Sequence, residues 1–218
     1  MLLKSYSFQI TFLDDYSFLN SGLAFINYQE TLEKDLNQTF LSFGGGIESC
    51  LVEDMLYSNV KMNIFALPVH TNRKEVAAKY ITAEGTLYLT PGYQKEDIWI
   101  FEPALNVSYV HMLEPFNKLG FNNLFFPTLF PQFRIQLQEN LQVGINLKFI
   151  LFLQGSNSPK NSGNGISSFS LFSRLFFDNG QTIILSFDYS KTQHQQYSTV
   201  GVITSDLANS SLSIGYGF

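Results

Sequence analysis

The chain has little charge. Asp, Glu, Lys and Arg make up only 14% of its 218 residues, whereas a typical soluble domain has about 25%. The 13 Lys and Arg residues are outnumbered by 18 Asp and Glu, which gives a net charge of −5. No basic stripe is present that could neutralise the phosphates of a nucleic acid. We therefore expect no nucleic-acid partner.

Cysteine is nearly absent, since Cys50 is the only one. A single cysteine excludes an internal disulfide, and no set of Cys and His residues has the spacing of zinc ligands. The run Gly44–Gly45–Gly46 lacks the lysine and the following helix of a phosphate-binding loop. We expect it to relieve crowding or to allow a bend in a strand. The sequence predicts neither a metal nor a cofactor.

Long hydrophobic runs are also missing. No window reaches the roughly 18–20 apolar residues of a transmembrane helix, and the longest runs, IFALPV and KFILFL, have the length of a strand. The first residues, MLLKSYSFQITF, do not have the basic, apolar and cleavage regions of a signal peptide. Two interpretations remain open: a mature chain with its signal peptide already removed, or a protein that is never exported. The strand chemistry below favours the first.

The chain instead has many aromatic residues (16%) and an alternation of apolar and polar residues along most of its length. Many alternating segments have about the 9–11 residues that cross the hydrocarbon layer at a tilt, whereas strands of soluble proteins average about 5–6. The candidate strands are residues 5–12, 18–30, 38–49, 56–67, 79–90, 97–111, 124–138, 141–154, 166–178, 180–191 and 211–218, with a doubtful one at 197–204. This pattern predicts an all-β protein, a single antiparallel transmembrane β-barrel.

The connections between these segments alternate in length. The sequences LDDYS, QEN and DNGQ suggest tight turns, and 69–78, 114–123, 155–165 and 190–197 are longer and polar, as in membrane barrels with short periplasmic turns and long outer loops. On this basis 190–209 becomes one outer loop, and the count is eleven. Because bacterial barrels have even strand numbers, we expect about twelve strands, the missing one within 39–67 or at 197–204, with ten as the alternative. No linker or repeat divides the chain, so residues 1–218 are expected to form one domain.

The C-terminal segment SSLSIGYGF has apolar residues at alternate positions and ends in Phe. It resembles the terminal β-signal of bacterial outer-membrane proteins, and the matching residues are Leu212, Ile214, Tyr216 and Phe218. The resemblance implies location in the bacterial outer membrane, contact with its lipid, recognition by the barrel-assembly machinery, and closure of the last strand against the first. It does not indicate a particular barrel family.

The alternation also predicts which charged residues face inward. From Tyr80 to Asp188 the apolar residues fall on odd numbers and the polar ones on even numbers. An Arg or Lys facing lipid at mid-depth would cost about 2–4 kcal/mol, so the polar side should be the lumen. With Lys61 from the strand at 56–67, the predicted lumen charge cluster is Lys61, Glu84, Glu102, Arg134, Lys148, Arg174 and Asp188. These side chains could form a charged constriction that controls passage or a salt-bridged plug. We favour the plug, because small barrels fill their interiors with side chains.

Three prolines, Pro103, Pro127 and Pro131, fall on the apolar face of candidate strands. Proline lacks the backbone N–H and is confined to strand ends, edges and bulges. We expect these three at strand ends or bulges near the membrane boundary. A lateral opening in the wall is the alternative.

Catalytic signals are weak. His70 and His194 fall in polar connections, and His111 ends a strand on its apolar side, where lipid hydrolases of this membrane place a catalytic histidine. The segment His70–Thr71–Asn72 resembles the His-x-Ser-Asn of a lipid A deacylase, but Thr replaces Ser. We assign no catalytic residues and do not expect an enzyme.

The expected function is therefore a narrow passive channel or a structural or assembly component of the envelope, with other envelope proteins as partners. One alternative is a lipid-modifying enzyme of the outer membrane. Another is a soluble β-barrel that binds an apolar ligand, with the Phe- and Leu-rich face turned inward.

Overall fold

The computed structural model describes residues 16–30, 35–52, 55–72, 79–89, 99–114, 123–151, 154–155, 167–198 and 201–218. All regular structure in these residues is β, and all strand pairs are antiparallel. The strands are β1 (Tyr16–Glu30), β2 (Leu36–Val52), β3 (Leu56–Thr71), β4 (Lys79–Leu89), β5 (Trp99–Glu114), β6 (Asn123–Gln138), β7 (Leu141–Ile150), β8 (Gln154–Gly155), β9 (Ser167–Phe176), β10 (Thr182–Ser198) and β11 (Gly201–Gly217). No helix among the described residues is long and apolar enough to cross a membrane.

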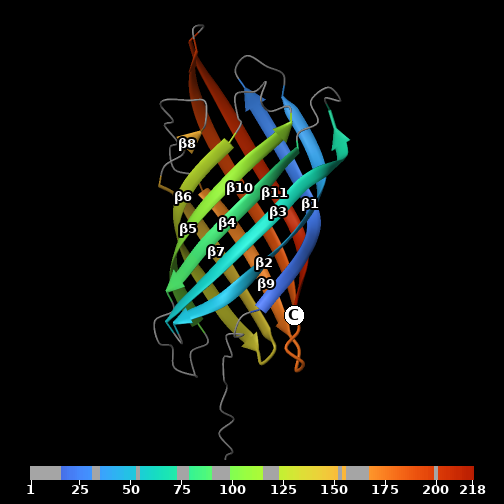
Figure 1. Cartoon of the computed structure of the whole chain (residues 1–218), viewed down its shortest axis with the longest axis vertical. Coiled ribbons are helices and arrows are strands. Elements are labelled where there is room, and N and C mark those ends of the chain that lie inside the picture. Colours follow the sequence, from blue (N-terminus) through green and yellow to red (C-terminus); the bar gives the residue numbers. More distant parts are fainter. Residues whose placement is uncertain are drawn as a thin grey trace, which may run out of the picture.

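The strands form a closed barrel (Figure 1). Their order around the wall is β5-β4-β3-β2-β1-β11-β10-β9-β7-β6, and pairing of β6 with β5 closes the ring. This ring has ten strands. The two-residue β8 is extra and pairs with β6 beyond the end of β7. The expectation of an all-β antiparallel barrel is confirmed. The expected number of twelve strands is wrong, and the alternative of ten describes the closed wall.

Ten of the eleven candidate strands correspond to the ten wall strands, but the expected strand ends are wrong at the last hairpin. Residues 190–209 are not an outer loop, because β10 continues to Ser198 and β11 begins at Gly201. The two strands pair without interruption from Thr182–Gly217 to Ser198–Gly201. The polar composition of 190–197 therefore indicates a hairpin that rises above its neighbours at the top of Figure 1. The region 39–67 holds one hairpin, β2–β3, and no additional strand. The candidate strand at 5–12 lies outside the described residues.

Two of the predicted tight turns are explained by local chemistry. Glu139 and Asn140 form a two-residue connection between β6 and β7. In the β9–β10 turn, Gly180 donates its N–H to the Phe177 carbonyl oxygen at 3.0 Å and has a φ of +83°. A turn followed by a residue with positive φ is a common three-residue hairpin, and glycine adopts that φ without steric cost.

The period of two decides which side chains face outward. On β1, Ala24, Ile26 and Tyr28 are buried in the barrel, whereas Leu23 and Phe25 are exposed. The same alternation continues around the wall. The exposed outward set includes Leu41, Phe43, Val60, Met62, Leu87, Leu105, Leu129, Leu147, Leu171, Leu185, Leu212 and Ile214. The outer surface of the barrel is therefore an apolar belt.

The glycine run lies in the middle of β2, where the wall is crowded. A Cβ atom at Gly46 would clash with the Val60 carbonyl oxygen and would lie 2.7 Å from Cζ of Phe18. A Cβ at Gly44 would clash with the side chain of Asn63. The absence of side chains here lets the Phe18 ring and Asn63 pack against the inner wall.

The prolines do not lie where the sequence suggested. Pro103 is inside β5, and Pro127 and Pro131 are inside β6. Pro103 and Pro131 stand directly opposite each other in the β5–β6 ladder. The expectation of strand ends or bulges is wrong for Pro131, which occupies the middle of a strand paired on both sides.

Candidate functional site

The candidate site is the interior of the barrel, where polar side chains from all sides of the wall meet. The structure places the charged side chains at the seven predicted positions, Lys61, Glu84, Glu102, Arg134, Lys148, Arg174 and Asp188, on inward-facing positions of their strands. They do not form one cluster. They divide into groups that contact one another at different places along the lumen.

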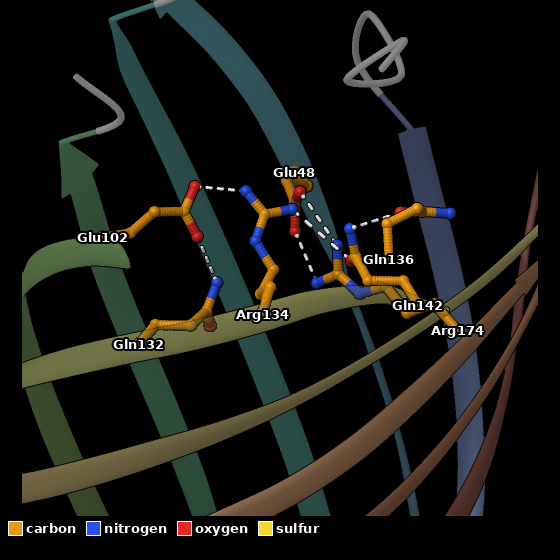
Figure 2. Close-up of polar contacts among 7 residues, drawn as sticks. All are labelled: Glu48, Glu102, Gln132, Arg134, Gln136, Gln142 and Arg174. Carbon is orange, nitrogen blue, oxygen red and sulfur yellow. Dashed lines mark hydrogen bonds and ion pairs between the residues drawn. The ribbon is translucent and has the colours of Figure 1, made fainter. Parts of the chain in front are cut away.

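The first group joins neighbouring strands β5 and β6. Glu102 and Arg134 form an ion pair, and their side chains are only 2% and 4% exposed. Gln132 Nε2 donates to the second carboxylate oxygen of Glu102 at 2.6 Å. Arg134 also reaches Gln142 Oε1 on β7 at 3.4 Å. A buried charge is costly unless it is paired and hydrogen-bonded, and both charges of this group are. The group is a fully enclosed polar network on one wall (Figure 2).

The second group crosses the lumen. Arg174 on β9 donates from Nη2 to Glu48 Oε2 at 3.2 Å and from Nη1 to Glu48 Oε1 at 3.5 Å. Strands β9 and β2 are separated by β10, β11 and β1 around the wall, so this two-pronged contact ties opposite sides together (Figure 2). Asn59 Nδ2 donates to the same Glu48 carboxylate at 3.2 Å. The arginine also lies over the Phe172 ring, 5.3 Å from its centroid.

A third group crosses the lumen elsewhere. Lys148 on β7 donates to Glu84 on β4 at 3.0 Å, and its ammonium lies 5.8 Å from the centroid of the Phe130 ring. Lys61 stands beside Glu84 in the β3–β4 ladder and interacts electrostatically with both Glu84 and Asp188. Asp188 accepts a hydrogen bond from the Ser170 hydroxyl. Charges from four strands therefore neutralise one another across a short distance.

The sequence missed one member of these groups, Glu48. With Glu48 included, the lumen acids among the described side chains are Glu48, Glu84, Glu102 and Asp188, and the bases are Lys61, Arg134, Lys148 and Arg174. The charges balance. The signal that could have found Glu48 was present, because Leu41, Phe43 and Ile47 place the odd positions of that strand on the outside. An even-numbered acid in the same strand had to point inward.

An apolar cluster lies inside the barrel at the end away from the start of β1 and the C-terminus. It comes from β1 to β4, where the rule of polar residues inside does not hold. Tyr28, Leu36 and Phe40 are fully buried. Tyr80 stacks on Phe65 with ring centroids 4.3 Å apart and meets Phe40 edge-on at 5.8 Å. We call this group, Tyr28, Leu36, Phe40, Phe65 and Tyr80, the aromatic cap.

A small polar cavity lies in the lumen between these groups. Its volume is about 110 Å³. Its lining combines charged and amide groups, such as Lys61 and Asn146, with aromatic rings, such as Tyr88 and Phe130. A cavity of this kind can hold a cluster of waters or one small solute.

The C-terminal residues singled out in the sequence lie on the outer face of β11. Leu212, Ile214, Tyr216 and Phe218 are all exposed. The strand pairs with β1 from Phe18–Gly217 to Glu30–Ser205. Phe218 extends this ladder, since its N–H donates to the Ser17 carbonyl at 2.9 Å and its carbonyl accepts from Ser17 N–H at 3.2 Å.

The histidines are spread over different strands. His70 is exposed at the end of β3, and His111 on β5 stacks on Tyr109 with ring centroids 6.3 Å apart. His194 belongs to β10 and not to a loop. The side chain of Asn72 accepts from Asn37 N–H at 2.8 Å and donates to the Asp35 carbonyl at 3.0 Å, so it holds the start of β2. Within the described ranges no three His, Cys, Asp or Glu residues gather as metal ligands would.

Comparison with known proteins gives likenesses to solved structures alone. No protein-family model matches the chain, and no curated protein matches it. A TodX mutant, a monoaromatic hydrocarbon channel, is 5% identical with a TM-score of 0.43, covering 94% of this chain and 89% of that one. The translocator domain of the autotransporter NalP from Neisseria meningitidis is 9% identical with a TM-score of 0.43, covering 97% and 90%. The outer-membrane protein OprG from Pseudomonas aeruginosa is 9% identical with a TM-score of 0.40, covering 94% and 96%. With TM-scores below 0.5, these likenesses carry no argument about what this chain does.

Proposed function

We propose that the chain is an integral β-barrel of the bacterial outer membrane whose lumen is closed, and that it serves as a structural component of the envelope and not as an open channel. The closed lumen is inferred from two ion pairs that cross it, Glu48–Arg174 and Glu84–Lys148. The location rests on the outer surface of the barrel.

The outer surface supports a membrane location through its extent and its uniformity. Soluble proteins rarely expose apolar patches larger than a few hundred Å², whereas here every strand of the wall carries exposed Leu, Ile, Val, Phe, Met or Tyr side chains. The wall strands have 10 to 17 residues, and about 9–11 suffice to span the hydrocarbon layer. A closed wall also leaves no unpaired sheet edge, as the membrane interior requires.

Closure of the lumen rests on two barriers in series. The Glu48–Arg174 pair crosses the lumen near the end where β1 begins, the Glu84–Lys148 pair crosses it further along, and the aromatic cap lies at the other end. Each ion pair is half-shielded or better, with side-chain exposures of 15% and 12% for Arg174 and Glu48. Charges held in ion pairs are not available to bind an ion that passes through the lumen.

If the lumen is closed, planar bilayers that contain the protein should be electrically silent. The purified wild-type protein should show no discrete conductance steps. The double substitution Glu48→Ser and Arg174→Ser removes one crossing pair without leaving a lone charge, but the Glu84–Lys148 pair and the aromatic cap remain. Adding Glu84→Ser, Lys148→Ser, Phe40→Ala and Tyr80→Ala removes these barriers too, so the combined variant should produce small, discrete steps. Single-channel recording with the same amount of inserted protein is the measurement.

The matched control is Lys191→Ser with Asp206→Ser. This ion pair is longer (3.9 Å), and its Lys191 side chain is 54% exposed outside the lumen, so its removal should leave the bilayer silent. Discrete steps from the wild-type protein would contradict the closed lumen and favour a charged constriction.

We also propose that the outward residues of β11 act during assembly, as the resemblance to the terminal β-signal implies. Deleting Phe218 should lower the amount of barrel inserted in cells, because the barrel-assembly machinery would no longer find the terminal aromatic ring. The refolded variant should lose only about 1–3 kcal/mol, since the ring is 61% exposed and the folded state loses the two backbone hydrogen bonds to Ser17 and a loose ring contact with Tyr216. Quantified outer-membrane fractions and denaturant unfolding of the same variant test this.

Replacement of Phe218 by Leu is the companion variant, because it keeps both backbone hydrogen bonds and removes the aromatic ring. Equal insertion of the wild type, the deletion and Phe218→Leu would remove the assembly role of this terminus.

A further inference from the structure

The ladder between β6 and β7 is interrupted in mid-strand without a change of register. It pairs Thr128 with Ile150 and Leu129 with Phe149, and resumes only at Gln132 with Asn146. The same register continues across the gap, so the strands have not slipped. By contrast, the β5–β6 ladder on the other side of β6 is continuous from Trp99–Ile135 to His111–Asn123. We call the stretch where β6 faces β7 and β8 the seam.

The two prolines of β6 explain the gap. The N–H of Leu151 on the far strand donates to the Pro127 carbonyl at 3.0 Å, so the backbone polar groups of Pro127 face β7. Pro131 lies four residues further along the strand and faces the same way. Neither proline has an N–H to donate. The seam therefore lacks two ladder hydrogen bonds on one side of one strand.

The missing donors leave acceptors without their ladder partners. In this register Leu147 stands opposite Pro131, so the Leu147 carbonyl oxygen receives no ladder bond from it. An unsatisfied backbone group in the hydrocarbon layer costs several kcal/mol. Beyond Leu151 the pairing shifts by one residue, to Phe125–Gln154 and Leu124–Gly155. The seam is thus a stretch of the wall that proline weakens on hydrogen-bond grounds.

The lumen cavity lies directly behind the seam. Phe130 and Lys148, the inward residues at the gap, both line that cavity, and so do their neighbours Gln132 and Asn146. The lysine is held over the Phe130 ring and paired with Glu84. Separation of β6 from β7 at this point would open the cavity to the outer surface of the barrel.

We propose that the wall opens at the seam, around Phe130–Pro131 and Leu147–Lys148, and that small amphipathic molecules enter the cavity sideways from the membrane. The cavity suits a molecule with a ring-sized apolar part and a hydrogen-bonding group, because aromatic rings and amide groups line it together. Axial entry is blocked by the cross-lumen ion pairs and the aromatic cap. This inference rests on the proposed function in so far as the outer surface must face lipid.

The test uses a thiol placed behind the seam. In the full-length protein with Cys50→Ser, the substitution Asn146→Cys puts a thiol on the cavity wall, and the barrel is reconstituted in phospholipid vesicles. N-phenylmaleimide, which is small and amphipathic and partitions into the bilayer, should label this thiol. A charged, water-soluble methanethiosulfonate should label it far more slowly.

Pro131→Val decides whether labelling passes through the seam. The valine restores the N–H that bonds to the Leu147 carbonyl, so labelling by N-phenylmaleimide should slow by about tenfold, as expected for one regained hydrogen bond. Pro127→Val should act in the same direction. Pro103→Val is the matched control, because it makes the same change on the same outer face directly opposite Pro131 but outside the seam. It should leave the rate unchanged.

The outcomes distinguish failure of the lateral route from failure of the closed lumen. An unchanged rate in Pro131→Val and Pro127→Val, with both variants folded as judged by heat-dependent mobility on gels, overturns the lateral route and leaves the closed barrel intact. No labelling of the thiol by N-phenylmaleimide also overturns the route. Equally fast labelling by the charged reagent shows axial entry, and the closed lumen of the proposed function then fails.

Discussion

Replacing Arg134 by Ala should destabilise the folded barrel by about 3–5 kcal/mol, the cost of removing one partner from a buried ion pair. The Glu102 carboxylate, 2% exposed beside Arg134, would keep the amide of Gln132 as a donor but would lose the guanidinium with which it is paired. Denaturant unfolding of vesicle-reconstituted protein measures the effect. This substitution is expected to cause the largest loss of stability in the lumen, because no other ion pair among the described residues is so deeply enclosed.

The cost should come from the lone charge and not from the lost attraction. The double substitution Glu102→Leu and Arg134→Met keeps similar volume and removes both charges, so it should recover most of the stability. Lys191→Ala is the control at the exposed Lys191–Asp206 pair and should change the free energy of unfolding by less than about 1 kcal/mol. A loss below about 1 kcal/mol for Arg134→Ala would mean that the lumen is wet and the network is not enclosed.

The sequence was sufficient to predict the wall of the barrel but not the number of its strands. Alternation over β5, β6, β7, β9 and β10 is regular because each strand has lipid on one side and lumen on the other. The period of two is therefore visible in the sequence. The error over 190–209 arose because polarity was taken as a sign of a loop. A hairpin that extends past its neighbours has two polar faces, so its strands lose the alternation that identifies them.

The interior was predictable only where it is polar. The alternation pointed to the seven charges because a charge on the outer face would be costly, but it gave no pairing. Which acid meets which base depends on closure of the ring, and Glu48 meets Arg174 only because β2 and β9 face each other across the lumen. The aromatic cap was missed for a related reason. Inward Phe40 and Tyr80 carry the same apolar signal as outward Leu41 and Ile81.

The prolines show where a local rule and the closed wall disagree. By local chemistry a proline belongs at the end or edge of a strand, and Pro131 lies inside β6 with strands on both sides. A closed ring of strands has no edge strand, so the missing N–H of Pro131 leaves a gap in the β6–β7 ladder. The sequence held the residue and its chemistry, while its consequence depends on which neighbour the proline faces.

The most direct test of the membrane-facing belt is Leu171→Arg in vesicle-reconstituted protein. Leu171 is 45% exposed in the middle of β9, between Ile145 on one neighbouring strand and Phe187 on the other. In water, a charged residue at so exposed a position changes stability by about 0.5 kcal/mol or less. Facing hydrocarbon, an arginine near mid-depth costs about 2–4 kcal/mol.

The measurement is the free energy of unfolding of Leu171→Arg beside that of Asp178→Arg, which puts the same side chain at an exposed position of the β9–β10 turn. The account predicts a loss of about 2–4 kcal/mol for Leu171→Arg and about 0.5 kcal/mol or less for Asp178→Arg. Equally small losses for both variants would contradict it, because the apolar face of the barrel would then not be in contact with lipid.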